Sequence, residues 1–230
     1  NENTAIFSTL KYTDKISKNN EIKLALNYGE YVQTVDALHT NGSDLLSEYK
    51  ERSYSAKVEL KNTTIDKNNL LVGTKLKRYE SVKTKLSGFT GVSDIVTPDL
   101  ERDIYSAYIK NNYLLTTSTN VEAGLRYDDY SDFGDNTSID LGLIHRFSDD
   151  ISFKLKHAHS FRAPSWTELY GLNGDSSLGA EIADNTEFGF VYSKNSFTRL
   201  SLNTYYSKIK NYIEKVNNKY SQNSQLRLHG

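Results

Sequence analysis

The residue types and spacings that come closest to a metal site are a histidine pair and an acidic cluster. His157 and His159 are two positions apart, which places both imidazoles on one face of a strand. A zinc site needs three or four ligands, and nothing beside this pair supplies the others. The acidic cluster consists of Asp128, Asp129, Asp132 and Asp135. It lacks the spacing and the final bidentate glutamate of a calcium-binding loop. We therefore expect a solvated loop there, and neither a metal nor a cofactor.

Enzymatic chemistry is also disfavoured. The chain has no Cys, so thiolate ligands and a cysteine nucleophile are excluded. A phosphate-cradling glycine loop, a Ser/His/Asp arrangement in a plausible context and a helical HExxH motif are all missing from the sequence. The 28 Lys and Arg balance 29 Asp and Glu along the chain, which gives no basic footprint for nucleic acid. We expect a protein that is not an enzyme and does not bind nucleic acid.

The elements that carry these residues are predicted to be strands, because apolar residues recur with a period of two and not with a helical period. In the clearest segment, Tyr54, Ala56, Val58 and Leu60 alternate with polar and charged residues. The ten predicted strands are Ala5 to Tyr12, Glu21 to Val32, Arg52 to Thr63, Asn69 to Tyr79, Asp103 to Leu115, Asn120 to Asp128, Thr137 to Phe147, Ile151 to Phe161, Asn185 to Tyr192 and Phe197 to Lys208. An eleventh strand is expected to begin near Gln225.

Short polar turns alternate with longer connections between these strands, which is typical of an up-and-down meander. A soluble sandwich or barrel also alternates, but its inner face must pack a dry core, and here that face carries charge in nearly every strand. The charged set is Lys57, Glu59, Lys61, Lys75, Lys77, Glu122, Arg126, Lys154 and Lys156. The pattern therefore predicts an all-β, antiparallel transmembrane β-barrel wall with the apolar parity toward lipid, short periplasmic turns and long extracellular loops.

Tyrosines support this interpretation, because amphipathic rings gather where hydrocarbon meets water. The chain has 17 Tyr, and those expected in such belts are Tyr12, Tyr28, Tyr79, Tyr127 and Tyr192. A general preference of Tyr for strands is the alternative explanation.

One segment resembles a known family. Residues 160–171 read SFRAPSWTELYG, which is similar to the "FRAPS..ELYG" segment of TonB-dependent outer-membrane receptors. The residues that carry the signature are Phe161, Arg162, Ala163, Pro164, Glu168, Leu169 and Tyr170, with Leu178, Glu181, Glu187 and Gly189 matching farther on. The chain departs from the family pattern at Asp175, Ser176 and Ala180, where the family has Asn and two prolines, so a less rigid loop is expected.

The resemblance implies a bacterial outer-membrane receptor that takes up a scarce nutrient, such as a ferric siderophore, haem or cobalamin, with energy delivered by TonB. It implies a barrel of about 22 strands, so residues 1–230 are expected to be a partial barrel of about ten strands, without the plug domain and the C-terminal strands. The implied partners are outer-membrane lipid, the nutrient, and the TonB complex through the plug. A small self-closed porin or adhesin and an outer-membrane barrel enzyme remain as alternatives.

Within the signature, a structural role is favoured over ligand contact, because the segment marks a strand that leaves the membrane and is fixed by proline at the start of a loop. Trp166 and Tyr170 are the aromatic candidates for ligand contact in this loop, and anchoring at the membrane interface is the alternative role for them.

Overall fold

The computed structural model describes residues 2–38, 44–87, 95–97, 100–171, 173–194, 197–217 and 219–230. Nearly all of them belong to strands of one antiparallel sheet, and the single short helix is α1 (Trp166–Tyr170). The strands are β1 (Glu2–Ser17), β2 (Asn20–Leu38), β3 (Asp44–Asn62), β4 (Asn68–Ser87), β5 (Ile95–Thr97), β6 (Leu100–Thr116), β7 (Thr119–Tyr130), β8 (Gly134–Arg146), β9 (Ile151–Arg162), β10 (Glu181–Ser193), β11 (Arg199–Val216) and β12 (Lys219–His229).

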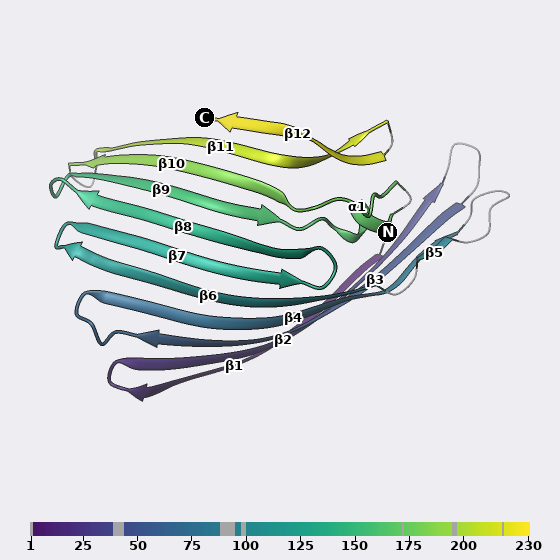
Figure 1. The fold of residues 1–230 in the computed structure, drawn as a ribbon, viewed down its shortest axis with the longest axis horizontal. Helices are drawn as coiled ribbons and strands as arrows, with labels where there is room; N and C mark the ends of the chain where they lie inside the picture. The colour runs from purple at the N-terminus through teal and green to yellow at the C-terminus, as the bar shows by residue number, and fades with distance from the viewer. Residues whose placement is uncertain are drawn as a thin grey trace.

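The sheet has up-and-down topology. Each strand pairs with the next along the chain, except that β4 pairs with β6 and the three-residue β5 is attached to β4. Figure 1 shows a curved wall, with the short turns at one end and α1 at the other. In the described part of the chain, β1 pairs only with β2 and β12 only with β11, so the wall is not closed. The pairing of first and last strands that a self-closed barrel requires is therefore not observed.

The predicted strands correspond to β1 to β4 and β6 to β11, and their antiparallel order is confirmed. Two predictions were wrong in detail. β12 begins at Lys219 and not near Gln225, so the long connection predicted from Ile209 to Ser224 is a tight hairpin. β2, β3 and β4 have 19 to 20 residues, more than the 11 to 12 predicted for each, because these strands continue to pair beyond the predicted segments.

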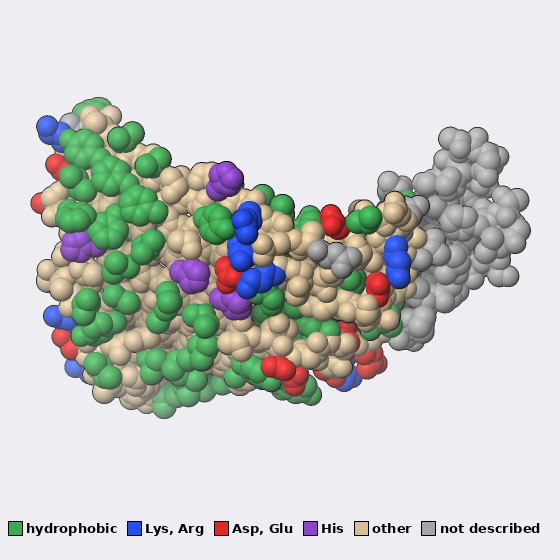
Figure 2. Space-filling model, turned by 45° about the horizontal axis from the view of Figure 1, so that its top comes forward, with side chains coloured by type: hydrophobic (Ala, Val, Ile, Leu, Met, Phe, Trp, Pro, Cys, Tyr) green, Lys and Arg blue, Asp and Glu red, His purple; other side chains and the backbone are tan. Residues whose placement is uncertain are grey.

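The outer face of the sheet is apolar. The register aligns Leu26, Ala56, Leu76 and Tyr105 in one row across β2, β3, β4 and β6. Large apolar side chains of this face, such as Leu125 and Leu141, are each 49% exposed. In Figure 2, hydrophobic side chains cover much of the visible face toward the short-turn end, and histidine and charged side chains appear farther along. Surface of this kind is stable only against lipid or another apolar partner.

The opposite face is polar. Glu59, Gly73 and Tyr108 share one row, and the Tyr108 hydroxyl donates to Glu59 Oε1 at 2.7 Å across the glycine between them. A Cβ at Gly73 would lie 2.5 Å from the Tyr108 oxygen, so the row needs glycine there. Arg126 donates to Asp128 and Ser106 on the same face. These hydrogen-bond networks lie on the face whose charged residues were predicted to point into the barrel interior.

The prediction that Tyr79 belongs to the aromatic belt was wrong, because this side chain faces inward. It shares the inner row with Ser53 and Arg102, whereas Tyr28 and Tyr127 lie on the apolar parity as predicted.

No helix among the described residues is long and apolar enough to cross a membrane.

Candidate functional site

The signature loop connects β9 to β10 and is held by Arg162, the last residue of β9. Arg162 Nε donates to Glu181 Oε2 at 2.6 Å, and its two terminal nitrogens donate to Glu168 at 2.9 and 3.0 Å. Burial alone would raise the pKa of both carboxyls. The hydrogen bonds from Arg162 outweigh it and, with the Ser165 and Ile213 amides, lower the pKa of Glu168 and of Glu181 below the usual range. One guanidinium therefore ties the end of β9 to the loop and to β10.

The helix α1 begins with a capping box. Ser165 Oγ accepts from the Glu168 amide at 3.3 Å, and Glu168 Oε2 accepts from the Ser165 amide at 2.7 Å. This pattern satisfies two amides at the helix start. Glu168 thus caps the helix and binds Arg162 at once, which fixes the orientation of α1 on the strand end.

Pro164 is fully buried, and its carbonyl accepts from Arg102 at 3.0 Å. Arg102 comes from β6 and also pairs with Asp132 at 2.6 Å, with side-chain exposures of 10% and 12%. A nearly buried ion pair that also binds a loop carbonyl fixes the loop against the wall. The link joins residues 62 positions apart.

The far part of the loop packs on the last hairpin. Leu169, Leu178 and Ile213 form the buried hydrophobic cluster of the described residues, with Tyr220 packed against it. The Ile213 amide donates to Glu181 Oε1 at 2.7 Å, and Gln222 bonds both the amide and the carbonyl of Gly179. The loop is therefore a small packed unit.

A pocket of about 300 Å³ opens where this loop meets the inner face of the strands. Its lining residues are Glu51, Tyr79, Arg102, Ile104, Tyr130, Ala163, Ser165 and Trp166. The Arg102 guanidinium lies 5.9 Å from the Trp166 ring centroid and 6.0 Å from that of Tyr130, which suits cation–π contact. The Trp166 indole nitrogen is buried with no hydrogen-bond partner among the described residues. The pocket therefore combines three aromatic side chains with a paired arginine.

The remaining predicted residues are spread along the same strands. Phe161 packs edge-on against Tyr130 at 5.7 Å. Tyr170 is 40% exposed and does not line the pocket. Glu187 is exposed in the row of Lys156 and Tyr205, and buried Gly189 lies between Lys154 and Asn203. The loop thus gathers Arg162, Pro164 and Glu168 at one place, whereas Glu187 and Gly189 lie farther down the wall.

Metal-site candidates do not converge. His157 Nδ1 lies 3.0 Å from Thr186 Oγ1, and His159 Nδ1 lies 2.6 Å from Asp184. Among the described residues no group of three or more potential ligands is arranged to hold a metal. In the acidic cluster, Asp128 and Asp132 are each engaged by an arginine.

Sequence reasoning missed Arg102, Tyr130 and Asp132 as parts of the site. Their partners lie on other strands or in the distant loop, and no local motif connects them. The one available signal was that Arg102 has inward parity near the start of β6, which places a charged side chain on the inner face at that end of the strand.

An open antiparallel wall with one apolar and one polar face is a segment of a transmembrane β-barrel. The sequence model of the TonB dependent receptor-like beta-barrel family matches residues 1–230, and the chain belongs to this family of Gram-negative outer-membrane proteins.

Individual relatives agree with this family. The chain is 39% identical over 115 residues to the probable TonB-dependent siderophore receptor PirA of Acinetobacter baumannii, covering 41% of this chain and 15% of the relative. It is 32% identical over 95 residues to the vitamin B12 transporter BtuB of Vibrio cholerae, covering 41% and 15%. The solved copper transporter OprC superposes with a TM-score of 0.80 at 15% identity, covering 98% of this chain and 43% of that one. The chain thus spans less than half the length of these proteins.

Proposed function

We propose that this chain forms part of the barrel wall of an outer-membrane receptor for TonB-dependent uptake of a scarce nutrient, such as a ferric siderophore, haem or cobalamin. The relatives named above carry different cargoes by name, so family membership supports uptake without selecting the ligand. The TonB complex would act through a plug domain, and the outer face of the wall would contact lipid.

The observation that carries the proposal is the pocket on the inner face, at the end of the wall that carries the signature loop. Side chains from β3, β4, β6, β7 and the loop meet there, so a bound molecule would contact both the wall and the loop. Barrels of this type carry their long loops on the extracellular side, so the pocket lies where a nutrient would first bind.

The chemistry of the pocket favours stacking over capture of a charge. Arg102 is already paired with Asp132, so its charge is largely compensated. The aromatic side chains of Tyr79, Tyr130 and Trp166 remain for a ligand with a conjugated ring. Of the two predicted contact residues, we assign ligand contact to Trp166 and not to Tyr170.

The experiment compares Trp166→Ala with Tyr170→Ala in the full-length receptor. Binding of ferric siderophores, haemin and cyanocobalamin to whole cells is measured at matched surface expression. We expect Trp166→Ala to weaken binding of one of these ligands by tenfold or more, about 1.4 kcal/mol, and Tyr170→Ala to change it less than threefold. Equal effects of the two variants, or none for Trp166→Ala, would overturn the assignment.

For Phe161, Arg162, Pro164, Glu168 and Glu181 we propose a structural role. Arg162 connects the two carboxylates, and buried Pro164 presents its carbonyl to Arg102. These contacts support a role in holding the loop, and thereby Trp166, over the inner face.

A further inference from the structure

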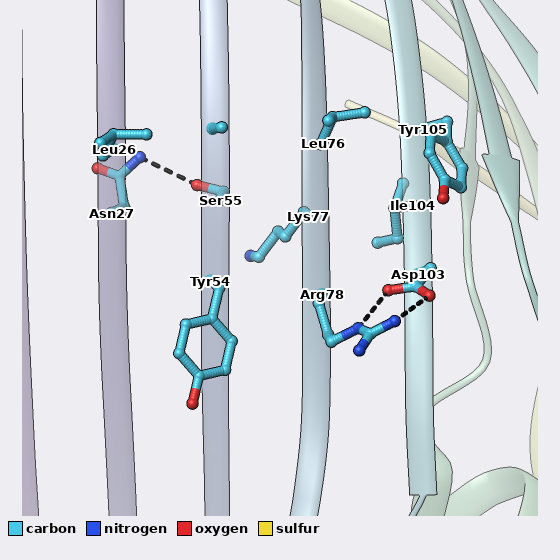
Figure 3. Close-up of a pocket in the computed structure, with 11 residues that line it drawn as sticks. Leu26, Asn27, Tyr54, Ser55, Leu76, Lys77, Arg78, Asp103, Ile104 and Tyr105 are labelled. Atoms are coloured by element: carbon cyan, nitrogen blue, oxygen red, sulfur yellow. Dashed lines mark hydrogen bonds and ion pairs between the residues drawn. The ribbon is translucent and has the colours of Figure 1, made fainter.

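A second cavity lies on the opposite, lipid-facing side of the wall. It has a volume of about 400 Å³ and lies over β2, β3, β4 and β6. Seven of its eleven lining residues have lipid-facing parity, and the other four belong to the inward row between them, Asn27, Ser55, Lys77 and Ile104. Its floor is Ala56, which stands in one row between Leu26 and Leu76, with Tyr105 next in that row. Figure 3 shows Leu26, Leu76 and Tyr105 at one level across their strands. Because Ala56 carries only a methyl group between longer side chains, the apolar surface has a groove there.

The groove has a polar end. In the adjacent row, toward the signature-loop end of the wall, Tyr54 stands beside Arg78 and Asp103. Arg78 donates from two nitrogens to Asp103, each at 2.7 Å (Figure 3). The Arg78 guanidinium also lies 3.9 Å from Glu101. Paired charges on a lipid-facing parity are stable only at the depth of the headgroups. The ion pair therefore marks the membrane boundary, and the apolar part of the groove extends below it into the hydrocarbon.

We propose that this groove binds one acyl chain of a membrane lipid, with the lipid headgroup beside Arg78 and Asp103. The occupant follows from continuity, because the groove interrupts the surface that already faces lipid. Lipid tails are as apolar as the groove walls, so affinity over ordinary boundary lipid must come from shape, through van der Waals contact on three sides of the chain. Leu26, Leu76 and the Tyr54 ring supply those sides.

Photocrosslinking tests the proposal on the full-length receptor. The receptor is reconstituted in vesicles of phosphatidylethanolamine and phosphatidylglycerol that contain a phosphatidylethanolamine with a diazirine midway along one acyl chain. Crosslinked peptides are mapped by mass spectrometry. We expect several-fold more crosslinking at Ala56 and Leu76 than at Ala123 and Leu141, which lie on the same apolar face of β7 and β8.

Ala56→Leu fills the groove, and Ala123→Leu is the matched control on the open lipid-facing surface. We expect Ala56→Leu to reduce crosslinking at Leu76 and Tyr105 to the level of Leu141, and Ala123→Leu to leave it unchanged. Heat-dependent gel mobility shows that each variant is folded. Uniform crosslinking around the wall, or unchanged crosslinking in folded Ala56→Leu, would overturn the proposal. Because the readout needs no nutrient, the result is independent of the proposed uptake.

Discussion

Replacing Arg162 with alanine should release the signature loop. The change removes three charge-assisted hydrogen bonds and leaves two carboxylates, 13% and 10% exposed, without their cation. Breaking a buried pair costs about 3–5 kcal/mol. Arg162 itself is 46% exposed, so solvent screening reduces the expected loss to about 2–4 kcal/mol. The substitution therefore reduces the stability of the closed loop and leaves the stability of the sheet unchanged.

The loss should depend on pH. Since the folded-state pKa of Glu168 and of Glu181 lies below the unfolded value, their contribution to stability is complete at neutral pH and is lost as the pH falls through the folded-state pKa. In Arg162→Ala, burial would raise both pKa values, so the penalty is present at neutral pH and disappears as the carboxyls take up protons. The difference between wild type and variant is therefore largest near neutral pH and shrinks in acid.

Hydrogen-exchange mass spectrometry of the full-length receptor in detergent measures this opening. The reporting amides are those of Leu169, Asp175 and Ile213, which donate to Ser165, Glu168 and Glu181. A loss of about 2–4 kcal/mol corresponds to roughly 30- to 900-fold faster exchange at neutral pH. Arg227→Ala is the control, because its hydrogen bond in the structure is to Gln225. Unchanged exchange in Arg162→Ala, or a difference that grows in acid, would refute the reasoning.

Three further changes test other parts of the account. Ser165→Ala removes the cap of α1 and should cost about 1 kcal/mol of loop stability, seen as faster exchange at Leu169, while exposed Thr167→Ala changes it little. Gly73→Ala should displace the Tyr108 ring from Glu59 and lower the midpoint of thermal unfolding, whereas Gly142→Ala, with 3.4 Å to its nearest atom, should be tolerated. Leu141→Lys on the lipid face should cost about 2–4 kcal/mol in refolding into vesicles if it lies near the midplane, and inward-facing Asp140→Lys much less; equal costs would contradict the assignment of faces.

Much of the wall could be predicted from the sequence, because alternation reports directly which face of a strand is apolar. The shared face of Leu26, Ala56, Leu76 and Tyr105 follows from that parity, whereas their alignment in one row is set by the register. The same rule also contradicts the belt role predicted for Tyr79, since Leu76 and Arg78 face outward and Tyr79 must therefore face inward.

Where alternation fails, the prediction fails. β11 has register shifts between Ile209 and Ile213, and Asn211 has a φ of 54°, so the apolar period is broken and the strand was predicted to end too early. The ends of β2 and β3, residues 33–38 and 44–51, pair beyond the predicted strands, because their apolar and polar residues do not alternate regularly.

The candidate site depends on contacts that no local pattern contains. The signature showed that residues 160–171 matter, but the pocket also needs Arg102 and Tyr130, which reach it through the register of β6 and β7. The link from Arg102 to the Pro164 carbonyl involves a backbone atom, so residue types alone carry no signal for it.

The central claim is that the chain is part of a nutrient receptor driven by TonB. The most direct measurement is uptake by cells that express the full-length receptor, with radioactive iron on siderophores, with haemin and with labelled cyanocobalamin, in strains with and without TonB. We predict accumulation of one nutrient class that requires both the receptor and TonB. Accumulation of none of them, or uptake that persists at the same rate without TonB, would contradict it.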